Sequence, residues 1–165
     1  MLDPVAATEA WLRDFVVALD LCPFAAGPLR AGAVRVIASR SCTMQDLLAD
    51  LLNEIEVLRG EGASTTLLVV PSLLADWDDF LDLLAFAEDL LDETGDAAFV
   101  QLVGFHPDYV FGDAPVGDPA NATNRSPFPM LHLLRRDEVA RAIEGHPDVS
   151  GIPERNIALL RERAE

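Results

Sequence analysis

Hydrophobic residues recur along this chain at two spacings, and the two spacings predict alternating helices and strands. Helical spacing predicts helices over residues 4–20, 44–59, 76–94, 138–144 and from 153 onward. Short apolar runs predict strands over residues 33–37, 65–70 and 97–105. Capping residues such as Asp3 and Thr43, together with prolines and glycines, bound most of these segments.

Residues 129–134 fit both patterns. As a strand, this segment places Met130, His132 and Leu134 on one face, whereas as a helix start it would group Met130, Leu131 and Leu134. We favour a strand, because Asp137 can then cap the separate short helix that follows.

The order of these elements predicts the fold class. Helices and strands alternate through most of the chain, which favours an α/β (α+β) fold, a two-layer sandwich with an approximately four-stranded mixed sheet and helices packed on it. A length of 165 residues fits one domain over residues 1–165, since single domains most often contain about 100 to 150 residues.

The charge of the chain restricts its partners. The net charge is −16, and the acidic excess lies in residues 1–120, whereas residues 121–165 carry equal numbers of acids and arginines. Such a negative field repels phosphate backbones and anionic lipids, so we expect neither nucleic acid nor a membrane as a partner. A small anionic molecule stays possible, because the arginines gather near the end of the chain.

Other features of the composition concern location and chemistry. No apolar run approaches the roughly 20 residues that span a bilayer, and no secretory signal begins the chain, so we expect a cytoplasmic protein. Two cysteines, Cys22 and Cys42, are too few for a disulfide framework and fit a reduced compartment. The chain contains no lysine, which excludes Schiff-base mechanisms.

Polar chemistry is concentrated in one long loop, between His106 and Pro127. Loops of about twenty residues in a compact domain usually bind something or are disordered, and this one combines charged, amide and hydroxyl side chains with prolines. We therefore predict a polar pocket where this loop meets Cys22 and the last helix. The sequence indicates no particular cofactor, because phosphate-loop, nucleophile-elbow and dinucleotide motifs are missing.

Four segments of the chain resemble a known family. These segments are Leu21-Cys22-Pro23-Phe24-Ala25, Phe105-His106-Pro107-Asp108-Tyr109, the run Thr123 to Arg135 that begins Thr-Asn-Arg-Ser-Pro, and Ile152-Pro153-Glu154-Arg155-Asn156-Ile157. The chain resembles domain-of-unknown-function family 1415 over nearly its whole length. This resemblance implies a single-domain protein of bacterial type and implies no particular reaction.

The leading hypothesis for the pocket is anion binding, and whether catalysis follows is left open. Arg125 would be a forked donor to a carboxylate or phosphate, with His106 and Asp108 as acid–base catalysts. Further ligand-binding candidates are Asn121, Thr123, Asn124, Ser126, His132, Glu154, Arg155 and Asn156.

Cys22 allows two other chemistries. Paired with His106, its thiol could be a nucleophile. Cys22, His106 and His132, with Asp108, are also residue types that bind zinc, although no close-spaced ligand pair is present.

The remaining alternative is a protein-interaction or scaffold domain. It would use the acidic face of helix 76–94 to bind a basic partner, and the polar loop would then be purely structural, because Asn, Asp and Ser before proline commonly form turns.

Overall fold

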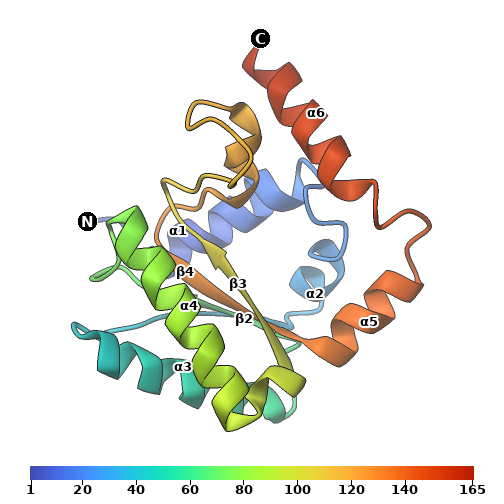
Figure 1. Cartoon of the computed structure of the whole chain (residues 1–165). Coiled ribbons are helices and arrows are strands. Elements are labelled where there is room, and N and C mark those ends of the chain that lie inside the picture. The colour runs from blue at the N-terminus through green and yellow to red at the C-terminus, as the bar shows by residue number, and fades with distance from the viewer.

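One mixed sheet with helices on both faces forms the body of the protein (Figure 1). The computed structural model describes residues 1–165. The elements are α1 (Pro4–Trp11), a π-helix (Leu12–Val17), α2 (Ala26–Arg30), β1 (Val34–Ala38), α3 (Met44–Arg59), β2 (Thr65–Val69), α4 (Trp77–Thr94), a 3₁₀ turn (Asp96–Ala98), β3 (Val100–Phe105), a 3₁₀ helix (Pro119–Asn124), β4 (Met130–Arg135), α5 (Arg136–Glu144) and α6 (Ile152–Ala164).

The sheet has the strand order β1-β2-β4-β3, and the predicted α+β fold with a four-stranded mixed sheet is confirmed. Strand β1 runs parallel to β2, whereas β4 is antiparallel to both of its neighbours, β2 and β3. In this register His132 of β4 lies between Leu67 of β2 and Val103 of β3. The centre of the sheet is therefore built from two strands that are far apart in sequence.

Helices α3 and α4 pack on one face of the sheet, and we call it the closed face. Thr43 and Asp76 accept hydrogen bonds from the first backbone N–H groups of these helices, which fixes where each begins. Their apolar stripes bury a core against the strands, with Phe80 fully enclosed. A Cβ atom on Gly104 would lie 2.8 Å from the Phe80 ring, so glycine there lets α4 approach β3 closely.

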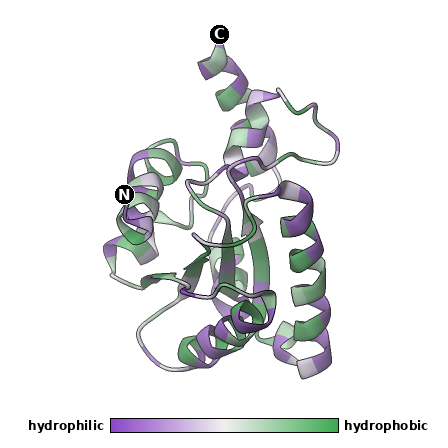
Figure 2. Ribbon diagram, turned by 90° about the vertical axis from the view of Figure 1, so that its left-hand side faces the viewer, coloured by the Kyte–Doolittle hydropathy of each residue, from purple (hydrophilic) through white to green (hydrophobic).

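The other face is covered only in part, and we call it the open face. Leu12 and Val16 of the π-helix pack there on Leu67, Val69 and Met130. We predicted a single continuous helix over residues 4–20, but the chain changes to a π-helix at Leu12. Figure 2 shows the hydrophobic strands lying between helices on their two sides.

Residues 130–135 form strand β4, so the predicted strand is confirmed over this segment. Pleating places Met130, His132 and Leu134 on the open face, while Leu131 and Leu133 belong to the core of the closed face. His132 consequently points away from α3 and α4.

Candidate functional site

His106, the predicted catalytic residue, is fully buried and lies against α4, on the side of the closed face. Its Nε2 atom lies 2.9 Å from the carbonyl oxygen of Leu74, and its Nδ1 atom accepts a 3.0 Å hydrogen bond from the backbone N–H of Asp108. The ring packs against Trp77 and Phe80. Because both ring nitrogens have backbone partners, neither is left to exchange a proton with a substrate.

Asn121 and Arg125 hold the polar loop together from inside. Asn121 is fully buried and donates to the carbonyl oxygens of Pro115, at 2.8 Å, and Val116, at 3.2 Å. Arg125 donates from Nε to the Tyr109 carbonyl and from Nη2 to the Val116 carbonyl, both at 3.0 Å. These bonds engage Nε and Nη2 of the guanidinium, which are N–H groups that the predicted anion binding by Arg125 requires.

The smaller polar residues of the loop also bond to backbone, whereas the Asp108 side chain is exposed. The side chains of Thr123, Asn124 and Ser126 each donate to a carbonyl oxygen: Thr123 to Ala120 at 2.9 Å, Asn124 to Gly104 at 3.4 Å and Ser126 to Phe128 at 2.6 Å. The loop therefore has the hydrogen bonding of a structural element.

Two candidates on α6 fasten the turn that carries Cys22. Arg155 forms a 3.1 Å ion pair with Asp20 and donates to its carbonyl oxygen, and the buried Asn156 donates to the carbonyl oxygen of Leu21 at 2.7 Å. Asp20 has a positive φ of 52°, so these contacts with α6 lie at a turn with an uncommon backbone conformation. Glu154, in the first turn of α6, is exposed to solvent.

A cavity of about 670 Å³ occupies the uncovered part of the open face, and we call it the sheet-face cavity. Strands β2, β3 and β4 form its floor, the π-helix and residues 22–29 form one wall, and α5 forms another. Its lining is mostly apolar and includes Leu12, Val16, Phe24, Leu67, Val103, Phe105 and Leu134. The polar floor residues are Thr65, Gln101 and His132.

His132 is the principal polar group of this floor. Its Nε2 atom lies 2.6 Å from the hydroxyl oxygen of Thr65, and the same hydroxyl lies 2.8 Å from the carbonyl oxygen of Leu133. The solvent-accessible part of the His132 ring lines the cavity. Desolvation by the apolar surroundings lowers the pKa of His132 from 6.5 to about 4. The imidazole is therefore neutral at physiological pH.

Cys22 lies at the rim of the same cavity, so the structure brings together Cys22 and His132 of the predicted site. The residue is exposed, yet atoms that crowd its sulfur raise the pKa of the thiol by desolvation, against the effect of hydrogen bonds from the backbone of Phe24 and Ala25. An activated nucleophile requires the opposite shift, toward the thiolate.

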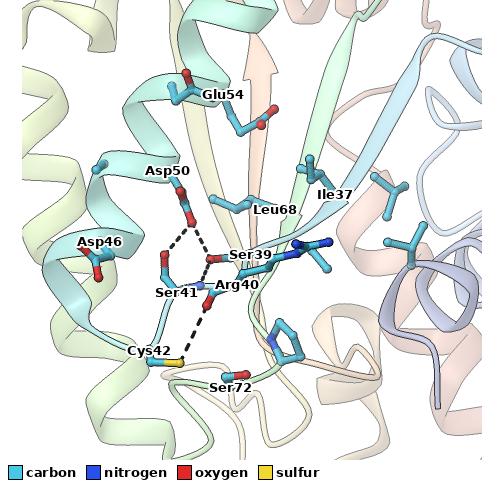
Figure 3. A pocket seen from close by; sticks show the side chains of 16 residues that line it. Ile37, Ser39, Arg40, Ser41, Cys42, Asp46, Asp50, Glu54, Leu68 and Ser72 are labelled. Atoms are coloured by element: carbon cyan, nitrogen blue, oxygen red, sulfur yellow. Dashed lines mark hydrogen bonds between the residues drawn. The ribbon is translucent and has the colours of Figure 1, made fainter. Parts of the chain in front are cut away.

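A second and broader pocket, the β1–α3 pocket, opens where the parallel strands β1 and β2 end (Figure 3). Asp50 of α3 accepts hydrogen bonds from the hydroxyls of Ser39, at 2.6 Å, and Ser41, at 2.7 Å. Asp46, Glu54 and Arg40 also line it, and because the three carboxylates outnumber the one arginine, the charge of the pocket disfavours anions. Carboxyl ends of parallel strands are common ligand sites, but the sequence does not predict this pocket, because residues 39–42 resemble an ordinary turn.

The structure assembles no group of three or more His, Cys, Asp or Glu side chains that could hold a metal ion. The ligand set considered from the sequence is divided by the sheet, because His106 packs against α4 whereas His132 faces the sheet-face cavity. None of the helices combines the length and apolarity required to cross a membrane.

Apart from Cys22 and His132, the residues that enclose the sheet-face cavity were not predicted as a site. Leu12, Val16, Leu67 and Val103 have the spacing of ordinary core residues, and a sequence gives no sign that the layer above them is incomplete. One residue in the sequence does point to this face of the sheet. His132 is a polar residue between Met130 and Leu134 on an otherwise apolar face of its strand.

The fold and its cavities define an α+β protein with one mixed sheet and an apolar chamber on that sheet. A family model described as "Protein of unknown function (DUF1415)" matches residues 3–165, and the chain belongs to this family. The comparisons with curated proteins and with solved structures give no match to this chain.

Proposed function

We propose that this protein binds a small, largely apolar molecule in the sheet-face cavity. The observation that carries the proposal is the cavity itself, about 670 Å³ of mostly apolar space with a few polar groups on its floor. Small-molecule sites are typically apolar concavities of roughly 300 to 1,000 Å³ with a few polar groups that orient the ligand. The neutral His132 and its partner Thr65 supply such groups.

The arrangement of the family segments supports this location. Residues 22–25 of the first segment form part of the cavity wall, and residues 123–135 contribute His132 and Leu134 to its floor. Residues 152–157 do not line the cavity but hold the turn before Cys22 through Asn156. Phe105 of the segment 105–109 also lines the cavity, so all four segments build or support one chamber.

This proposal replaces the anion clamp as the leading function. Arg125 donates to two backbone carbonyls, and both ring nitrogens of His106 are engaged by backbone. An anion at the polar loop would have to compete with those bonds. A ligand can enter the apolar cavity without breaking such bonds. For the location of the protein, a cytoplasmic one remains our expectation from the sequence.

A neutral solvatochromic dye tests the proposal. Nile red should bind the wild-type protein saturably, with the blue-shifted emission of an apolar environment. Val103→Trp places an indole on the cavity floor and should weaken dye binding at least tenfold, by occupying the space the dye requires. Val57→Trp, at an exposed position of α3, is the matched control and should leave binding unchanged.

Circular dichroism and thermal melting confirm that each variant is folded. Absence of saturable binding to the wild type, or equal affinity in the wild type and a folded Val103→Trp variant, would contradict the proposal.

A further inference from the structure

The hydrogen bonds around Thr65 fix which nitrogen of His132 carries its proton. The Thr65 hydroxyl has one hydrogen and lies 2.8 Å from the carbonyl oxygen of Leu133, which can only accept. That hydrogen is therefore committed to Leu133. The 2.6 Å contact with His132 must then be donated by the histidine, from Nε2–H to the Thr65 oxygen.

The second ring nitrogen of His132 is consequently an acceptor. A neutral imidazole carries one N–H, so Nδ1 presents a lone pair, and no protein group donates to it. Nδ1 of His132 is therefore an acceptor of fixed polarity on the mostly apolar floor of the cavity, where Thr65 and Gln101 are the other polar residues.

The charged groups near the cavity do not alter this polarity. Glu138 and Arg141 of α5 are its charged lining residues, and Arg141 is paired with Glu138 at 3.2 Å and with Asp137 at 3.4 Å. No lining cation is left unpaired to compensate a buried anion, and an anionic oxygen would repel the lone pair of Nδ1.

We infer that the sheet-face cavity selects uncharged molecules with an apolar body and a hydrogen-bond donor, of the alcohol or phenol class, whose O–H donates to Nδ1 of His132. The inference rests on the proposed function and names its ligand class. It differs from the sequence-based expectation of an anionic ligand in both charge and location.

A matched series of naphthalenes tests the ligand class. 2-Naphthol carries a donor, 2-methoxynaphthalene has the same ring without a donor, and 2-naphthoate carries a negative charge. Displacement of Nile red from the full chain should rank them in that order, with 2-naphthol about tenfold tighter than 2-methoxynaphthalene, as one neutral hydrogen bond provides.

Two variants locate the selectivity. His132→Phe keeps a ring on the floor but removes the acceptor, so it should abolish the difference between the naphthol and its methyl ether while Nile red still binds. Thr65→Val frees the histidine to adopt either tautomer and should reduce the difference. The wild-type ranking stands by itself if either variant fails to fold.

The outcomes separate the two proposals. Saturable Nile red binding with equal affinities for the naphthol and its ether overturns the ligand class and leaves the cavity as a binding site. Tightest binding of 2-naphthoate also overturns the class and restores the anion hypothesis. Failure of Nile red and of every naphthalene to bind overturns the proposed function, and the ligand class with it.

Discussion

The two faces of the sheet use similar apolar side chains but differ in what covers them. On the closed face, α3 and α4 bury a continuous core against the strands, and residues such as Leu131 and Phe80 have no exposed surface. On the open face, the π-helix covers one end of the strands and leaves about 670 Å³ over the rest. The comparison shows that a strand can be equally hydrophobic on both sides and yet build a core on one side and a chamber on the other.

The largest expected effect separates two leucines at the centre of the sheet. Leu131 of β4 packs in the core of the closed face, whereas Leu67 of β2 borders the sheet-face cavity. Buried Leu→Ala changes cost about 2 to 5 kcal/mol, and the cost grows with the void that remains, so we expect about 4 kcal/mol for Leu131→Ala and about 2 kcal/mol for Leu67→Ala. Urea unfolding measures both, and equal losses would mean that the two faces are packed alike.

The next largest effect is a pH dependence of the free energy of unfolding, caused by His132 on the open face. The pKa of His132 falls from 6.5 to about 4 on folding, so between these values the unfolded state binds an extra proton. As pH falls from about 6.5 to about 4, His132 should remove on the order of 3 kcal/mol from the free energy of unfolding.

Subtraction isolates this histidine from other titrating groups. The cavity is also lined by Cys22, Glu138 and Arg141, and many carboxylates titrate near pH 4. The difference in unfolding free energy between wild type and His132→Phe, measured by urea titration from pH 4 to 7, should therefore carry the slope. A difference independent of pH would show that the histidine is not desolvated.

A smaller effect concerns the fastening of the cavity wall. Asn156→Ala leaves the buried Leu21 carbonyl without its donor and should cost about 1 to 2 kcal/mol. It should also weaken Nile red binding, because the loosened turn carries Cys22 at the rim. Arg155→Ala is the comparison, since its exposed ion pair with Asp20 should contribute less than about 1 kcal/mol. A larger loss from Arg155→Ala would reverse the roles assigned to these neighbours.

The smallest expected effect is on the rate at which the Cys22 thiol is alkylated. Because desolvation raises the pKa of the Cys22 thiol, iodoacetamide at pH 8 should alkylate Cys22 several-fold more slowly in the folded protein than in urea. Peptide mass spectrometry distinguishes Cys22 from Cys42, and saturating Nile red should slow the reaction at Cys22 further. Faster alkylation in the folded state would support the nucleophile hypothesis instead.

Periodicity was sufficient for much of the fold, because each helix or strand depends on a local pattern. The stripe of α3 and the continuous apolar run of β2 predict their elements within a residue or two. Strand order was beyond reach, since β4 enters between β2 and β3 through contacts that no local pattern encodes. The continuous first helix was wrong at Leu12, because a shift from α- to π-type bonding leaves the apolar spacing almost unchanged.

The candidate site was less predictable for a related reason. Side chains such as Asn121 and Arg125 bind ligands on some folds and backbone carbonyls on others, and only the folded loop shows that their donors turn inward. A cavity has no sequence signature either, because it depends on the reach of the covering layer. Cys22 and His132 were identified from chemistry alone, and they are the two predicted residues that line the sheet-face cavity.

The late position of β4 in the chain has a consequence for synthesis. Strand β2 is apolar on both faces, and the bond between its Thr65 and His132 joins residues 67 positions apart. A ribosome must therefore translate more than sixty further residues before β2 acquires its neighbour on that edge. Until then the nascent chain presents a hydrophobic strand with one unpaired edge, a feature that seeds aggregation. Folding of this protein should therefore be most vulnerable, and most dependent on chaperones, while residues 70–130 are being translated.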